Sequence, residues 1–149
     1  MIRPINQNDR KTYLTLSRAF YHSKAVLHPV PDRHLEDTFR QLTENSPFTK
    51  GFLIVEAGEA VGYCLLAVTW SQEAGGQVWW LEELYLRPEF QGMGLGSQVI
   101  RQLRDIRPPE VKRFRLEVEP ENQGARRLYE HLGFRSLGYR QMVLDFPQQ

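Results

Sequence analysis

The chain has 149 residues and a mass of 17.5 kDa, a length that suits one domain with a single hydrophobic core over residues 1–149 and excludes a two-domain enzyme. Nineteen Lys and Arg residues against eighteen Asp and Glu residues leave a net charge of +1, so no global field attracts nucleic acid or an anionic membrane. The one cysteine, Cys64, cannot form an internal disulfide, and no apolar run suits a signal peptide or a membrane span. We therefore expect a cytoplasmic protein.

The first half of the chain predicts two helices followed by sheet-forming sequence. Residues 2–5 read as a short strand, and Asn6 or Asn8 can cap a helix over residues 9–21. A second amphipathic helix is indicated by Leu35, Phe39 and Leu42, which recur at helical spacing. Three strands are then expected, over residues 52–56, 60–70 and 78–86.

The second half predicts two more helices, each followed by strand sequence. The first has the apolar stripe Leu95, Val99, Leu103 and Ile106 and must end at a Pro-Pro pair. The alternating strand 114–118 leads to a helix that is capped by Asn122 and ended by Gly133. Residues 134–139 and 141–146 are expected to be two closing strands. This order of elements predicts an α+β fold with a mixed sheet.

The segment that joins strand 78–86 to the next helix carries three glycines in five positions, Gly92, Gly94 and Gly96. Glycines let a ligand approach backbone N–H groups, and the N-terminus of a helix attracts negative charge, so the pattern predicts a cradle for phosphate or pyrophosphate. A nucleoside-triphosphate loop would need a Lys-Ser or Lys-Thr pair directly after its last glycine. Here the two residues after Gly96 are Ser97 and Gln98, so that kind of site is excluded. A nicotinamide-dinucleotide site stays open as an alternative, although the glycine spacing differs from its fingerprint.

The segment Leu-Glu-Glu-Leu-Tyr-Leu-Arg-Pro-Glu-Phe over residues 81–90, running into Gln91-x-x-Gly94-x-Gly96, resembles the acetyl-CoA-binding signature of the GNAT acyltransferase superfamily. The later block that holds Asn122 and then Tyr-x-x-Leu-Gly-Phe over residues 129–134 resembles a second element of that family. The resemblance covers about residues 80 to 139. It implies the GNAT fold, with a mostly antiparallel mixed sheet and helices on both of its faces.

The resemblance also implies which residues hold the cofactor. In the family, the strand before the glycine loop separates from its neighbour and its exposed backbone bonds the pantetheine arm, which assigns that role to Leu84, Tyr85 and Leu86. The diphosphate would lie on Gln91, Gly92, Met93, Gly94, Leu95, Gly96 and Ser97, with Asn122, Ala125 and Tyr129 along the pantetheine.

Acetyl transfer to an amine needs a neutral nucleophile and a proton for the departing thiolate. Tyr129 resembles the tyrosine with which many family members protonate the sulfur of coenzyme A. Glu82, at a position where polyamine-acetylating relatives bind the acceptor, is the first candidate to hold or deprotonate the ammonium group. Glu83 is the second candidate and Glu117 the third. In a regular strand Glu82 and Glu83 would point to opposite faces, so only one would reach the acceptor unless a bulge intervenes.

In this family the segment between the first two helices usually decides which acceptor is bound, and here that segment is residues 21–30. The four histidines show no metal-ligand spacing, so we assign no metal. We expect an acetyl-CoA-dependent N-acetyltransferase that acts on a primary amine of a small cationic molecule, with no nucleic-acid or membrane partner. The alternatives are a protein or peptide N-acetyltransferase and a non-catalytic sensor of coenzyme A. A homodimer is an arrangement that the resemblance leaves open.

Overall fold

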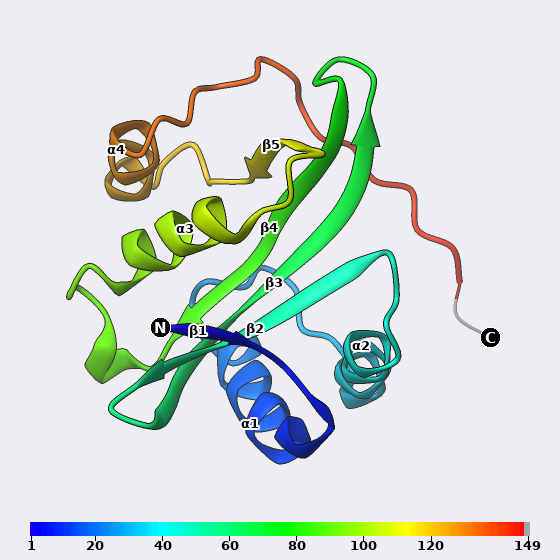
Figure 1. Cartoon of the computed structure of the whole chain (residues 1–149), viewed down its shortest axis with the longest axis vertical. Helices are drawn as coiled ribbons and strands as arrows, with labels where there is room; N and C mark the ends of the chain where they lie inside the picture. The colour runs from blue at the N-terminus through cyan, green and yellow to red at the C-terminus, as the bar shows by residue number, and fades with distance from the viewer. Residues whose placement is uncertain (148–149) are drawn as a thin grey trace. The chain divides into compact units, whose positions relative to one another are not determined.

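The computed structural model describes residues 1–147 and divides the chain into two compact units, Met1–Glu117 and Val118–Gln149 (Figure 1). The first unit holds β1 (Ile2–Pro4), α1 (Arg10–Tyr21), α2 (Asp32–Thr43), β2 (Thr49–Glu56), β3 (Glu59–Ser71), β4 (Gly76–Leu86), α3 (Leu95–Ile106) and β5 (Val111–Leu116). Two short 3₁₀ helices, η1 (Gln7–Asp9) and η2 (Pro88–Phe90), precede α1 and follow β4. The second unit holds α4 (Gln123–His131).

The strands described in the first unit form one five-stranded sheet in the order β1-β2-β3-β4-β5. Each of the first three strands is antiparallel to the next, whereas β5 runs parallel to β4 after the crossover through α3. A parallel neighbour needs such a crossover because a tight hairpin can join only antiparallel strands. The mixed α+β fold expected from the sequence is therefore confirmed.

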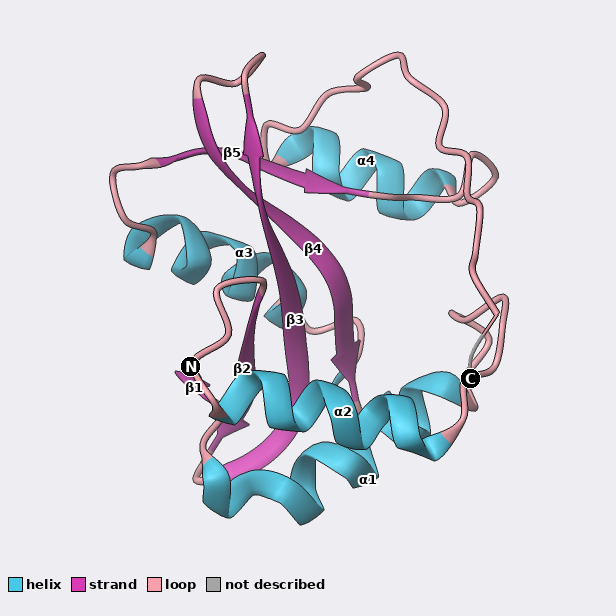
Figure 2. Ribbon diagram, turned by 90° about the vertical axis from the view of Figure 1, so that its right-hand side faces the viewer, coloured by secondary structure: helices cyan, strands magenta, loops and turns pink. Residues whose placement is uncertain are grey.

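Side chains that alternate along β2 belong to two apolar clusters, one on each face of the sheet. Figure 2 shows α3 on one side of the sheet and α1 and α2 on the other. Phe52 and Ile54 pack on the face covered by α3, together with Val99 and Leu103 of that helix. Leu53 points to the opposite face. There it packs with side chains of α1 and α2, which are Tyr13, Leu16 and Phe39. Each fully buried side chain of this size contributes about 1.5–3 kcal/mol, so the two layers anchor the helices that border the site.

The start of α1 is fixed by a buried carboxylate. Asn6 and Asp9 form a reciprocal capping box for η1, which leads directly into α1. Asp9, 6% exposed, also accepts two 2.8 Å hydrogen bonds from the guanidinium of Arg3. These hydrogen bonds lower the pKa of Asp9, although burial opposes the shift. Of the two caps expected from the sequence, Asn6 caps η1 and not α1 itself, whose N-cap residue is Asp9 and makes no side-chain cap hydrogen bond.

The two closing strands expected over residues 134–139 and 141–146 do not form. No strand follows Leu116 within residues 1–147, and Met142 and Leu144 are 94% and 82% exposed. Alternation of apolar residues does not make a strand by itself, because a strand also requires a neighbour that accepts and donates its backbone hydrogen bonds. Among residues 118–147, α4 is the only regular element, and a helix offers no such edge.

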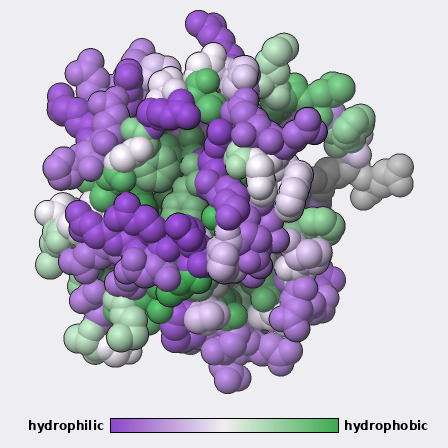
Figure 3. All heavy atoms as spheres, turned by 45° about the horizontal axis from the view of Figure 1, so that its top comes forward, coloured by the Kyte–Doolittle hydropathy of each residue, from purple (hydrophilic) through white to green (hydrophobic). Residues whose placement is uncertain are grey.

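The surface drawn in Figure 3 is largely hydrophilic, in keeping with a chain that is 25% charged. Trp79 is 3% exposed and stacks on Phe114 with ring centroids 5.8 Å apart. Among the helices described, none is both long enough and apolar enough to span a bilayer.

Candidate active site

A β-bulge interrupts β4 at Glu82. Leu66 of β3 lies opposite Leu81, and the next residue, Leu65, lies opposite Glu83, so Glu82 is an extra residue with no partner in β3. A bulge of this kind bends the strand and re-aims the side chains beside it. The bulge that would free both carboxylates from strict alternation is therefore present.

Beyond the bulge, β4 also parts from β5. Their pairing ends at Leu81 and Leu116, so residues 82–86 of β4 have β3 on one side and no strand on the other. The N–H of Arg87 donates to the carbonyl of Val61 at 2.8 Å, which fixes the phase of the ladder. By the alternation of an antiparallel ladder, the backbone groups of Leu84 and Leu86 point to the open edge.

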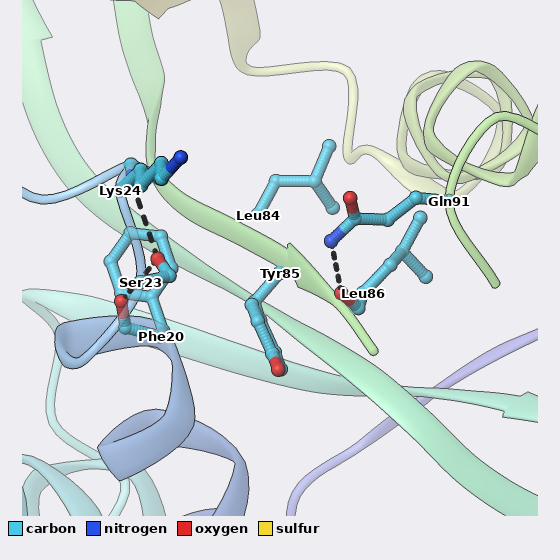
Figure 4. Close-up of a pocket in the computed structure, with 8 residues that line it drawn as sticks. Phe20, Ser23, Lys24, Leu84, Tyr85, Leu86 and Gln91 are labelled. Carbon is cyan, nitrogen blue, oxygen red and sulfur yellow. Dashed lines mark hydrogen bonds between the residues drawn. The ribbon is translucent and has the colours of Figure 1, made fainter. Parts of the chain in front are cut away.

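Two consequences follow for this edge. The backbone of Tyr85, by the same alternation, points toward β3 and not outward. The carbonyl of Leu86 accepts a 2.8 Å hydrogen bond from the side-chain amide of Gln91, so this acceptor is already engaged (Figure 4). Because Gln91 is exposed, a ligand that approaches the edge can take its place.

The glycine loop lies between η2 and α3. Gly92 and Gly94 adopt φ values of +74° and +78°, which only glycine takes up easily, and an added Cβ at either position would meet open space. Gly94 is the N-cap of α3 and offers no side-chain cap, so the first N–H groups of the helix are available to an anion. Met93 is exposed, whereas Leu95 and Ser97 are buried and anchor the start of the helix.

A cavity of about 320 Å³ lies between the end of α1 and the open part of β4. One wall is Leu84, Tyr85 and Leu86 with Gln91, and the other comes from the last turn of α1 and the loop after it (Figure 4). The residues of this second wall are Phe20, Ser23, Lys24 and Ala25. Ser23, Lys24 and Ala25 belong to segment 21–30, to which the family resemblance assigns the choice of acceptor, whereas Phe20 lies just before that segment.

The carboxylates around the bulge have different surroundings. Glu82 is an exposed residue, but partial desolvation of its carboxyl and the nearby charges of Glu117 and Glu83 raise its pKa above the ordinary value. Glu83 accepts hydrogen bonds from two phenols, that of Tyr21 at 2.6 Å and that of Tyr63 at 2.5 Å. No sequence motif indicates this triad, because Tyr21 and Tyr63 belong to elements that are distant in the chain.

The second unit holds the remaining predicted residues. Asn122 caps α4, and its side-chain oxygen accepts a 3.1 Å hydrogen bond from the N–H of Ala125. Tyr129 lies on α4 with its ring edge-on to Phe134, with centroids 5.7 Å apart, and burial raises its pKa. Gly133 ends the helix with φ +100°, as the sequence predicted.

Within residues 1–147, no group of three or more His, Cys, Asp or Glu side chains is arranged to hold a metal ion. His34 has a buried ring nitrogen without a hydrogen-bond partner, and it belongs to no such group among the described residues.

Comparison with known proteins gives a family match across most of the chain. The sequence model described as the acetyltransferase (GNAT) family matches residues 12–134. Thialysine N-epsilon-acetyltransferase from Sus scrofa is 36% identical over 78 residues, and that from Mus musculus is 32% identical over 87 residues. These alignments cover 52% and 58% of this chain and 45% and 51% of those proteins, so the chain spans about half the length of the curated relatives it matches.

Solved structures agree on the fold. A possible acetyltransferase from Clostridium difficile 630 superposes with a TM-score of 0.84 at 18% identity, covering 99% of this chain and 98% of that one. The structure of AAC(6')-Iy in complex with a bisubstrate analogue of coenzyme A superposes with a TM-score of 0.73 at 18% identity, covering 100% and 97%. At this level of identity the likeness concerns the fold alone.

Proposed function

Because the chain belongs to the GNAT family of acetyltransferases, we propose that it transfers an acetyl group from acetyl-CoA to a primary amine of a small cationic molecule. The observation that carries the proposal is the open edge of β4 at Leu84 and Leu86, which leads along the chain into the glycine loop and the N-terminus of α3. An extended amide arm and a diphosphate are the two parts of coenzyme A that such features suit.

The residues present fit that co-substrate. Leu84 and Leu86 offer backbone N–H and C=O groups to the pantetheine amides, in the way that one strand adds to another. The glycines at 92 and 94 leave open space where the diphosphate would approach, and the N–H groups of Leu95, Gly96 and Ser97 carry the positive end of the helix dipole. Asn122, Ala125 and Tyr129 of the second unit are proposed to line the pantetheine by family resemblance.

When bound, acetyl-CoA supplies a thioester whose carbonyl carbon is attacked by the amine nitrogen, with release of the thiolate. The amine must first lose its proton, because an ammonium group has no free lone pair. Glu82 is our candidate base. Its raised pKa makes it a better proton acceptor than an ordinary glutamate, and the cluster with Glu117 favours a cationic acceptor. Tyr129 is the proposed proton donor to the thiolate.

The acceptor class is supported by two observations. The paired carboxylates Glu82 and Glu117 concentrate negative charge beside the bulge. The curated relatives are named for thialysine, itself a cationic amine. Protein or peptide amines are the second class of acceptor that the fold can serve.

An acceptor screen with a thiol readout tests the proposal. Purified protein would be given acetyl-CoA with thialysine, spermidine, kanamycin or a lysine-containing peptide, and free coenzyme A would be detected with a chromogenic disulfide. Cys64 is fully buried and burial raises its pKa to about 12, so the protein's own thiol adds no background. We expect release with at least one small cationic amine.

Three other results would overturn the proposal. Thermal stabilisation by coenzyme A without turnover of any amine would indicate a sensor, and release only with the peptide would indicate a protein acetyltransferase. Stabilisation by NAD and not by coenzyme A would exclude the whole class.

A further inference from the structure

The carboxylate of Glu83 joins two elements that are far apart in the sequence. One oxygen accepts from Tyr63, a residue of β3 with no exposed surface, and the other accepts from Tyr21, the last residue of α1. Both hydrogen bonds are short and have a charged acceptor, which makes them about twice as strong as neutral ones. Glu83 therefore fastens the end of α1 to β4.

The residues that follow Tyr21 are tied to the same helix end. The N–H and the hydroxyl of Ser23 both donate to the carbonyl of Phe20, at 3.0 Å and 2.6 Å, and the N–H of Ala25 donates to the hydroxyl oxygen of Ser23 at 3.3 Å. Phe20, Ser23 and Ala25 form one wall of the cavity (Figure 4). The hydrogen bond from Tyr21 to Glu83 thus connects this wall to the opposite one on β4.

Glu83 is poorly placed to act as a base itself. Each of its oxygens already accepts a hydrogen bond from a phenol. Burial, together with the hydrogen bonds and the charge of Glu83, raises the pKa of both tyrosines. Both phenols thus stay protonated donors at neutral pH. Glu82, one residue earlier, has no such partners and keeps an exposed carboxylate.

We propose that Glu83 is a positioning residue that holds the two walls of the cavity at a fixed separation through Tyr21, and so sets how the acceptor amine is received. Glutamine at this position preserves the geometry, because its carbonyl accepts from one phenol and its NH₂ group donates to the other phenol oxygen. Alanine preserves neither bond. The kinetic part of the inference rests on the proposed function, whereas the structural part does not.

Steady-state kinetics with acetyl-CoA and thialysine separate positioning from base catalysis. We expect Glu83→Gln to keep kcat within about 3-fold and its pH profile unchanged, and Glu83→Ala or Tyr21→Phe to raise the KM for thialysine about 5- to 20-fold with little change in the KM for acetyl-CoA. A loss of 100-fold or more in the kcat of Glu83→Gln, with a shifted pH profile, would make Glu83 the base and overturn the proposal.

Hydrogen exchange of the protein without ligands gives a readout that needs no activity. We expect Tyr21→Phe to speed exchange of the Ser23 and Ala25 amides about 10-fold while leaving the β2–β3 amides unchanged. The matched control is Glu36→Gln, which removes the charge at an α1–α2 hydrogen bond with Arg10 near the other end of α1 and should not alter exchange at residues 22–25. Unchanged exchange in Tyr21→Phe would overturn the proposal. If the wild-type protein acetylated no amine, the proposed function would be refuted. The hydrogen-exchange comparison would still test whether the hydrogen bond between Tyr21 and Glu83 holds residues 22–25 in place.

Discussion

Two neighbouring glutamates on β4 have identical side chains but different surroundings, and we assign them different roles. Glu83 is hydrogen-bonded on both oxygens, whereas Glu82 is desolvated in part and faces the charge of Glu117. Both oxygens of Glu83 are occupied by phenol donors, so an acceptor amine could reach that carboxylate only by displacing one of them. The residue scale therefore favours Glu82 for proton chemistry, and this assignment can be tested by substitution.

Glu82→Gln is expected to raise the pH needed for activity. In the wild type, activity should fall as the pH drops through the raised pKa of Glu82, since protonation removes the base. Without the carboxylate, turnover must wait for the amine to deprotonate in solution, so kcat/KM at neutral pH should fall about 100-fold or more. The measurement is a pH profile with thialysine. A raised KM with unchanged kcat would instead mean that Glu82 only binds the ammonium group.

Tyr129→Phe is expected to lower kcat about 10- to 1000-fold with little change in the affinity for acetyl-CoA. The substitution keeps the ring that packs against Phe134 and removes only the hydroxyl. Single-turnover kinetics and calorimetry with coenzyme A measure the two quantities. Unchanged turnover would remove Tyr129 from the mechanism.

At the scale of elements, the close pairing of β3 and β4 beneath the site depends on one glycine. A Cβ on Gly62 would lie 2.1 Å from the carbonyl oxygen of Tyr85, a distance that neither backbone can accept without shifting. Gly62→Ala should therefore displace the open part of β4, lower the melting temperature and weaken coenzyme A binding. Gly124→Ala is the control, because a Cβ on Gly124 would come no closer than 4.0 Å to any atom beyond the adjacent residues and the helix backbone, the nearest being the side-chain oxygen of Asn122. A melting temperature in Gly62→Ala that equals the wild type's would contradict this account of the register.

The start of α1 provides a pH-dependent contribution to stability. The folded protein lowers the pKa of Asp9, so this contribution is complete above the unfolded pKa of about 3.9 and is lost as the pH falls through the lower folded value. Asp9→Asn should cost about 1–2 kcal/mol at pH 7, given that Arg3 is half exposed, and much less at an acidic pH below the lowered pKa of Asp9. Urea unfolding at the two pH values measures the difference. An equal cost at both would exclude the charge of Asp9 as its source.

The same scale shows what the sequence could and could not predict. The helices, the caps at Asn6 and Asn122, and the end at Gly133 follow from local chemistry that short segments carry by themselves. The bulge at Glu82 does not, because it is a mismatch between two strands and no single strand encodes it. The strands expected after residue 134 failed for the related reason that alternation does not supply a partner.

For the whole molecule, the glycine pattern predicted a ligand site at one strand-to-helix turn, and the fold places the open end of β4 next to that turn in the chain. The triad of Tyr21, Tyr63 and Glu83 was beyond reach because it joins α1, β3 and β4 through contacts that only the tertiary arrangement creates. A site formed by residues adjacent in the chain could be predicted from the sequence. Chemistry assembled from separate elements required the structure.

The parting of β4 from β5 also bears on self-association. Unpaired strand edges can template the growth of sheets between molecules, and long, flat edges are the most hazardous. Here the bare edge covers only residues 82–86, begins at a bulge that twists it, and has one acceptor occupied by Gln91. So short an unpaired edge offers enough backbone hydrogen-bonding groups to bind a flexible small molecule. It offers too few to start the growth of a sheet with another polypeptide.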